Sequence, residues 1–169
     1  MLPPNRNHLL SLLVIFSMIC AAACSNRHLD KRGKNIEIAE NWMSAVFSEA
    51  NILSAKALMH EDFRFTYMGE THLSNISYDE DGFFGKHLVI VDKLLPDVIG
   101  IRTTDVIADD SSVALVMEGN ANGINGEYNN RYVFTFKIEN DLILSVTEYN
   151  SDLLVMTRLY KNQLVPIQE

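Results

Sequence analysis

The sequence predicts an α+β domain, in which two or three helices come first and a run of antiparallel strands follows. Apolar residues recur at helical spacing from Ile36 to Phe47, and again in the segment that ends before Pro96. Residues 128–151 alternate between apolar and polar side chains around a short polar turn, which is typical of a β-hairpin. The order of these segments carries the prediction of the fold class.

The predicted helices follow from their apolar stripes and their ends. The first covers residues 36–48, and a short second helix covers residues 52–59. A third begins at the sequence Ser77-x-x-Glu80, which resembles a capping box, and ends at Pro96.

The predicted strands start with residues 63–68, whose aromatic side chains all fall on one face. Two more strands are expected at residues 98–108 and 112–120, before a loop at 122–126 that is rich in Gly and Asn. The terminal hairpin completes the sheet.

The hydrophobic pattern of the hairpin predicts its register. A three-residue loop, Glu139-Asn140-Asp141, pairs Tyr132 with Glu148 and Phe134 with Val146, and it separates apolar from polar side chains. A two-residue loop would instead place Phe134 opposite Thr147, which mixes the faces. We therefore predict the longer loop.

The end of the hairpin resembles a known superfamily. Its turn is Asn140-Asp141-Leu142-Ile143 and its last strand closes on Glu148-Tyr149-Asn150-Ser151-Asp152. This pattern is similar to the nuclear transport factor 2-like superfamily, in particular its SnoaL-like and ketosteroid-isomerase-like members, over about residues 35–155. The resemblance implies a cone-shaped, curved antiparallel sheet wrapped around helices. Such a cone encloses an apolar pocket, and many members form homodimers through the sheet.

Glu148 and Tyr132 are the predicted catalytic pair, because the carboxylate ends an apolar strand face across from the phenol. If that face is enclosed, desolvation raises the pKa of Glu148 towards neutrality, which suits a general acid or base. The alternative is that Glu148 lies hydrated at an open rim. The predicted pocket lining also contains Trp42, Phe65, Tyr67, His87, Phe134, Phe136, Val146 and Asn150.

Steroid isomerases of the resembling superfamily use an Asp base on the first strand, a Tyr donor on the first helix and an acidic donor on a late strand. At these places the chain offers Thr66 or Tyr67, then Trp42, then Tyr132. A phenol or an indole can donate a hydrogen bond, but neither is a good base at neutral pH. The pattern therefore favours ligand binding over steroid isomerisation.

The N-terminus predicts export. An apolar run from Leu9 to Ala23 follows Arg6 and ends in small residues, as a secretory signal peptide does. Ala21-Ala22-Ala23-Cys24 resembles a bacterial lipobox, which would make Cys24 the lipidated first residue and its membrane anchor. Ordinary cleavage, leaving a free Cys24 on a soluble periplasmic protein, is the alternative. We predict a signal peptide at 1–23, a polar tether at 24–34, a single domain at 35–160 and a tail at 161–169.

Charge and cysteine content exclude several functions. Without residues 1–23, which contain Arg6, the chain has 22 acidic and 13 basic residues and a formal charge of −9. Nucleic-acid binding needs basic patches, so this acidic balance argues against a nucleic-acid partner. Both cysteines, Cys20 and Cys24, precede the domain, and its histidines lack metal-ligand spacing. We therefore predict no metal and no cofactor.

Three functions are consistent with these patterns. The first is an envelope lipoprotein whose pocket binds a small, largely apolar molecule. The second is an acid–base enzyme of the isomerase, cyclase or hydratase type that uses Glu148. The third is an interaction module that forms a homodimer through its sheet.

Overall fold

The computed structural model describes residues 30–95 and 99–165. The predicted signal peptide and Cys24 lie outside the described residues. A first helix occupies residues 30–43 and continues directly into a π-helical turn, η1, at Ser44–Ser48. The remaining helical elements are α2 (Ile52–Ala57), α3 (Glu80–Gly82), η2 (Phe83–His87), α4 (Leu88–Leu94), α5 (Asp152–Leu154) and η3 (Val155–Leu159), of which η2 and η3 are also π-helical.

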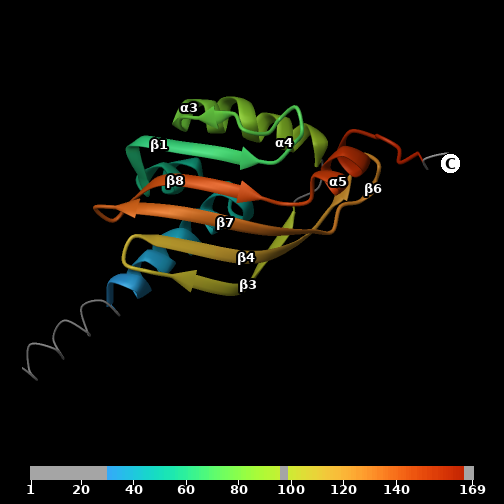
Figure 1. The fold of residues 1–169 in the computed structure, drawn as a ribbon. Coiled ribbons are helices and arrows are strands. Elements are labelled where there is room, and N and C mark those ends of the chain that lie inside the picture. The colour runs from blue at the N-terminus through green and yellow to red at the C-terminus, as the bar shows by residue number, and fades with distance from the viewer. Residues whose placement is uncertain (1–29, 96–98, 166–169) are drawn as a thin grey trace, which may run out of the picture.

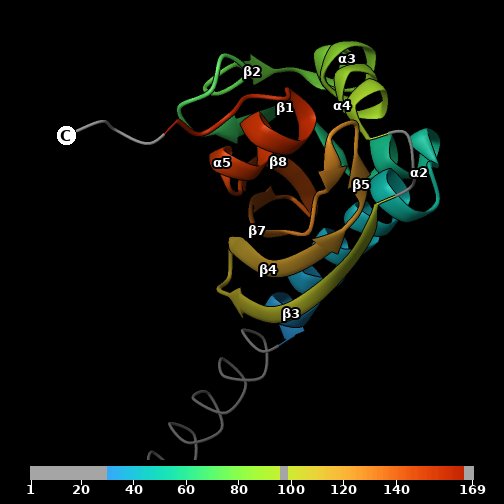
Figure 2. The ribbon, with the colours of Figure 1, turned by 90° about the vertical axis from the view of Figure 1, so that its right-hand side faces the viewer.

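Six strands form one curved sheet in the order β2-β1-β8-β7-β4-β3. Figure 1 shows α3 and α4 beside β1 at one edge and β3 at the other, and Figure 2 shows the curvature. A separate two-stranded ribbon pairs β5 with β6. The strands are β1 (Met59–Met68), β2 (Ser77–Tyr78), β3 (Gly100–Ala108), β4 (Ser112–Asn120), β5 (Asn122–Gly123), β6 (Gly126–Glu127), β7 (Asn130–Glu139) and β8 (Leu142–Tyr149).

The sheet confirms the predicted α+β class and its curved shape, with one feature that the sequence did not reveal. The first long strand, β1, pairs in parallel with the last strand, β8, while the other pairings in the six-stranded sheet are antiparallel. Tyr67 is thereby the register partner of Glu148. Residues far apart in the sequence meet in the middle of the sheet.

The predicted hairpin register is wrong by two residues. The turn has two residues, Asn140 and Asp141, with positive φ angles of 51° and 65°, and a bulge in β8 shifts the pairing by one more position. Phe134 lies opposite Glu148 and Phe136 opposite Val146. Side chains alternate with period two, so a shift of two keeps Phe134, Phe136, Val146 and Glu148 on one face. The bulge also explains why Ile143 is buried in place of Leu142 and Leu144.

Two predicted boundaries at helix starts also change. Residues 30–34, assigned to the tether, already belong to the first helix, although their side chains are exposed. Ser77 lies in β2 and does not cap a helix. Asp79 caps α3 instead, since its carboxylate accepts a hydrogen bond from the N–H of Gly82 at 2.8 Å.

A short helical segment that the sequence analysis did not predict follows β8. Ser151 caps α5, and η3 follows with Val155 and Leu159 buried. Figure 2 shows this segment close to the ends of the central strands. It contributes part of the pocket described below.

An aromatic cluster forms the core between the sheet and the helices. Trp42 is fully buried and stacks on Phe83, with ring centroids 5.4 Å apart. Phe63 and Phe136 contact the same indole ring at 6.1 and 5.9 Å. Each such ring buries a large apolar area, so this cluster holds the first helix and η2 against the sheet.

Candidate functional site

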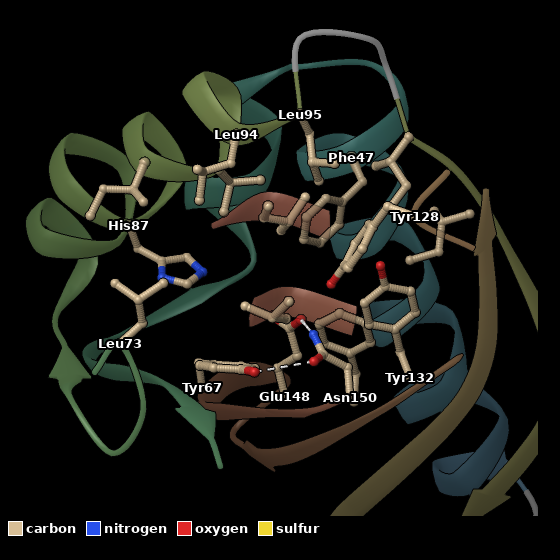
Figure 3. Close-up of a pocket in the computed structure, with 17 residues that line it drawn as sticks. Phe47, Tyr67, Leu73, His87, Leu94, Leu95, Tyr128, Tyr132, Glu148 and Asn150 are labelled. Carbon is tan, nitrogen blue, oxygen red and sulfur yellow. Dashed lines mark hydrogen bonds between the residues drawn. The ribbon is translucent and has the colours of Figure 1, made fainter. Parts of the chain in front are cut away.

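A cavity of about 80 Å³ lies between α4 and the ends of β1, β7 and β8. In Figure 3, Phe47, Leu94 and Leu95 form the upper wall, and the polar side chains of Glu148 and Asn150 lie on the opposite side. The cavity is therefore amphipathic, with an apolar roof and a polar floor. Small-molecule sites in proteins commonly combine an apolar lining with a few polar groups in this way.

Glu148 projects from β8 into this cavity. The side-chain N–H of Asn150 donates a hydrogen bond to Glu148 Oε1 at 2.8 Å. Burial raises the pKa of Glu148 from its ordinary value of 4.5 to about 7, and the Asn150 hydrogen bond only partly opposes this. Glu148 keeps some solvent exposure because its carboxylate borders the open cavity. The group can therefore both release and accept a proton near neutral pH.

Two tyrosines stand beside Glu148 on the β7 side. The hydroxyl groups of Tyr128 and Tyr132 hydrogen bond each other, and Asn130 Nδ2 donates to the Tyr128 hydroxyl at 2.9 Å. Burial raises the pKa of Tyr128 to about 12 and that of Tyr132 further in the same direction. Gly119 makes room for the Tyr132 ring, because a Cβ there would lie 2.7 Å from it. Both phenols thus keep their protons. One proton is used in the bond between the two hydroxyl groups, so the pair has one proton left to donate to a ligand oxygen.

A third phenol, Tyr67, comes from β1. Its hydroxyl donates to Asp152 Oδ1 at 2.6 Å and lies 3.2 Å from Asn150 Oδ1. Burial and the hydrogen bond to Asp152 raise the pKa of Tyr67. A continuous hydrogen-bonded chain therefore runs from Glu148 through Asn150 and Tyr67 to Asp152. This chain orients the side-chain amide of Asn150 towards the carboxylate of Glu148.

Asp152 acts as a brace between β1 and α5. Its second carboxylate oxygen accepts the backbone N–H of Glu70 at 2.7 Å, in addition to the Tyr67 hydroxyl. Gly69 permits this approach, since a Cβ there would collide with the Asp152 carboxylate. The terminal Asp of the resembling motif therefore supports the polar floor from outside the cavity lining.

His87 lies across the cavity from this network. Its ring packs on Phe65 and Tyr78, with centroids 4.6 and 5.4 Å away, and points into the cavity in Figure 3. Burial lowers the pKa of His87 from 6.5 to about 4. The imidazole is consequently neutral at physiological pH.

Each of the three π-helical turns described above contributes side chains to the cavity. Phe47 comes from η1, His87 from η2, and Val155 and Leu159 from η3. A π-turn inserts a residue into the helical repeat and so changes the direction in which the following side chains point. Of these four residues, the sequence analysis placed only His87 in the pocket, because the regular period of a helix stripe gives no sign of a π-turn.

Six of the predicted site residues line the cavity together: Glu148, Tyr132, Tyr67, His87, Phe134 and Asn150. Four others, Trp42, Phe65, Phe136 and Val146, lie outside its lining, in the aromatic and aliphatic core. They were assigned to the pocket because they share strand or helix faces with it, but the core fills the closed end of the cone. Trp42 therefore cannot donate to a ligand in this cavity.

Tyr128 is the main lining residue that the sequence analysis missed, because it precedes β7 next to the predicted loop. The signal was present, since residues 128, 130, 132 and 134 continue the buried face of β7 without interruption. Extending the alternation backwards from Tyr132 would have found it.

Within residues 30–95 and 99–165, no cluster of three or more His, Cys, Asp or Glu side chains is arranged to hold a metal ion. None of the helices in this part of the chain has the length and hydropathy of a membrane span.

Comparison with solved structures places this architecture. An NTF2-like protein from Burkholderia xenovorans is 15% identical with a TM-score of 0.62, covering 76% of this chain and 97% of that one. A putative isomerase from Bacillus subtilis is 16% identical with a TM-score of 0.63 (77% and 95% covered). A putative SnoaL-like polyketide cyclase from Jannaschia is 13% identical with a TM-score of 0.62 (78% and 95% covered). No protein-family model and no curated protein matches the sequence.

The protein therefore has a cone-shaped α+β fold with an amphipathic cavity. This is the fold of nuclear transport factor 2-like proteins, and the structures that resemble it include SnoaL-like members.

Gly69→Ala should destabilise the protein by about 1–2 kcal/mol, because its methyl group displaces the Asp152 carboxylate from Tyr67 and Glu70. Chemical denaturation measures this. Gly85→Ala is the matched control: a Cβ there meets nothing within 4 Å, and alanine favours a helix, so we expect equal or greater stability. Equal effects of the two changes would mean that the Asp152 brace contributes nothing.

Glu148 and His87 should make opposite contributions to the pH dependence of stability. Glu148 has a raised pKa in the folded state, so its contribution falls as pH rises from 4.5 to about 7. His87 has a lowered pKa, so its contribution rises with pH from about 4 to 6.5. The two contributions to the free energy of unfolding therefore nearly cancel in the wild type between about pH 4 and 7. Glu148→Gln should stabilise the protein at pH 8, by on the order of 2 kcal/mol, and leave it unchanged near pH 4.

His87→Phe provides the converse experiment. Without the histidine, stability should fall between pH 4.5 and 7, whereas Glu148→Gln should make it rise between pH 4 and 6.5. Denaturant titrations across this range measure both slopes. Glu139→Gln, at an exposed position of the same hairpin, controls for the change in net charge. Parallel pH profiles for all three variants would contradict the assignment.

Proposed function

We propose that this protein binds a small, largely apolar molecule that carries an oxygen function at one end. The observation that carries the proposal is the separation of polarity in the cavity. Glu148 and the phenols of Tyr128 and Tyr132 lie at one side, and aliphatic side chains from α4 lie at the other. The tyrosine pair has one hydroxyl proton free to donate to a ligand oxygen, and Glu148 can donate or accept according to its protonation.

The ligand is uncharged at this end. Among the described residues that line the cavity there is no Lys or Arg to pair with an anion. A cation would pair with ionised Glu148, but the surrounding phenols and apolar groups disfavour a charged pair whose desolvation is not repaid. A hydroxyl or carbonyl group matches the donors and acceptors without that cost.

The alternative function is acid–base catalysis on such a molecule. It is favoured by one observation, the pKa of about 7 at Glu148, since proton transfer is most efficient when the pKa of the group lies near the working pH. The structural neighbours include a putative isomerase and a putative SnoaL-like polyketide cyclase, which agrees with either function. The carboxylate for this catalysis belongs to Glu148 on β8, whose register partner on β1 is Tyr67.

Native mass spectrometry of purified protein tests both functions. Wild type should retain a small molecule, and Tyr132→Phe should lower its occupancy about fivefold to tenfold through loss of one hydrogen bond. Tyr149→Phe is the control, because Tyr149 is 45% exposed and does not line the cavity. A binding protein retains the same molecule in wild type and Glu148→Gln. An enzyme accumulates a different molecule, its substrate, in Glu148→Gln. Absence of any molecule, or equal occupancy in Tyr132→Phe, would contradict the assigned pocket.

We further propose that the mature protein is attached to the bacterial envelope through lipidated Cys24. The support is the apolar run that ends in three alanines before the cysteine. Self-association through the sheet stays a prediction of the family resemblance.

Intact-mass analysis of membrane-extracted protein should show loss of residues 1–23 and an added lipid mass on Cys24. Cys24→Ser should abolish the lipid mass and release the protein from the membrane fraction. A wild-type product that starts at Cys24 without lipid would leave export standing and contradict the anchor.

A further inference from the structure

A second cavity lies behind the upper wall of the first. Its volume is about 260 Å³, and it is bounded by η1, α2 and α4, with Ile52, Phe84 and Leu88 among its apolar lining residues. Four side chains belong to both cavities: Phe47, Val91, Leu95 and Ile99. We call these four residues the partition. The two cavities are therefore separated by a single layer of side chains.

The partition consists of side chains that can move without a change of backbone. All four are only partly buried, because there is free volume on both sides of them. Phe47 comes from η1, Val91 and Leu95 come from α4 and its C-cap, and Ile99 directly precedes β3. Rotamer changes of such side chains cost little and are fast compared with ligand exchange.

The cavity volumes favour a ligand that occupies both cavities. An apolar cavity that holds benzene measures about 150 Å³, and ligand pockets usually span about 300–1,000 Å³. The inner cavity, at about 80 Å³, is too small for a molecule of that size. Joined to the outer cavity, which is three times larger, it reaches the usual range.

We propose that the two cavities form one elongated binding site, in which an uncharged oxygen function lies beside Glu148 and Tyr132 and an unbranched apolar tail passes the partition into the outer cavity. This inference rests on the proposed function and adds the shape of the ligand to it. The side chains that line the outer cavity are apolar apart from Asp92, which is exposed, so they favour an apolar tail over a second polar group of the ligand. It also gives a role to Ile52, a large apolar side chain left 50% exposed.

A series of n-alkanols from butan-1-ol to decan-1-ol measures the length of the site. Trp42 is the only tryptophan of the chain and contacts Phe47 edge-on at 6.4 Å, so its fluorescence reports on the partition. Affinity should rise about fourfold for each added methylene across the whole series, because each one leaves water for an apolar surface. An affinity that stops rising after the shortest alcohols would overturn the two-cavity site.

A pair of neighbouring substitutions tests the outer cavity directly. Ile52→Asp places a charge in its lining, and an acidic residue in the first turn of α2 is compatible with the helix. It should weaken decan-1-ol binding at least tenfold and leave butan-1-ol within twofold. Leu53→Asp is the matched control, because Leu53 is 80% exposed and does not line either cavity. Equal effects of the two variants on decan-1-ol would overturn the proposal.

Glu148→Gln separates failure of this inference from failure of the proposed function. Two results together would retain the inner pocket and contradict the elongated site. The affinity for butan-1-ol would change in Glu148→Gln, and the affinity of the wild type for the n-alkanols would not increase with their chain length. If no alkanol binds at all, both are wrong.

Discussion

The parallel pairing of β1 with β8 is the constraint on which the site depends. It makes Tyr67 the partner of Glu148 and brings the end of β1 beside Asn150 and Asp152. Parallel neighbours need a long crossover, and here the crossover comprises all the elements between β1 and β8. The polar floor of the cavity can therefore form only when the sheet is complete. The hydrogen bonds of Asp152, for which Gly69 leaves room, then hold the first and last strands in the register that the site requires.

Burial determines the protonation of the cavity. A low-dielectric environment disfavours the charged form of every titratable group, so it raises the pKa of Glu148 and lowers that of His87. Between about pH 4 and 7 both groups are mainly neutral, and the tyrosines keep their protons. The cavity presents hydrogen-bonding groups without net charge under these conditions. That combination suits an uncharged, oxygen-bearing ligand and also leaves Glu148 able to exchange a proton.

The shape of the cavity comes from irregularities in regular elements. π-Turns redirect Phe47 and His87, a bulge in β8 moves Glu148 opposite Phe134, and glycines at 69 and 119 admit Asp152 and Tyr132. Each of these features costs some local stability or regularity. They concentrate around the cavity, while the aromatic core around Trp42 retains ordinary close packing.

The sequence by itself determined the α+β class, most element positions and the face of the hairpin that carries Glu148. Those properties depend on local periodicity, and period-two alternation survives a register shift of two residues. Only the tertiary structure decided that Phe134 lies opposite Glu148, that Tyr67 is the register partner of Glu148 on β1, and that Trp42 and Phe136 belong to the core. A bulge, a π-turn and a parallel pairing are stabilised by contacts between distant segments, so no pattern within one segment specifies them.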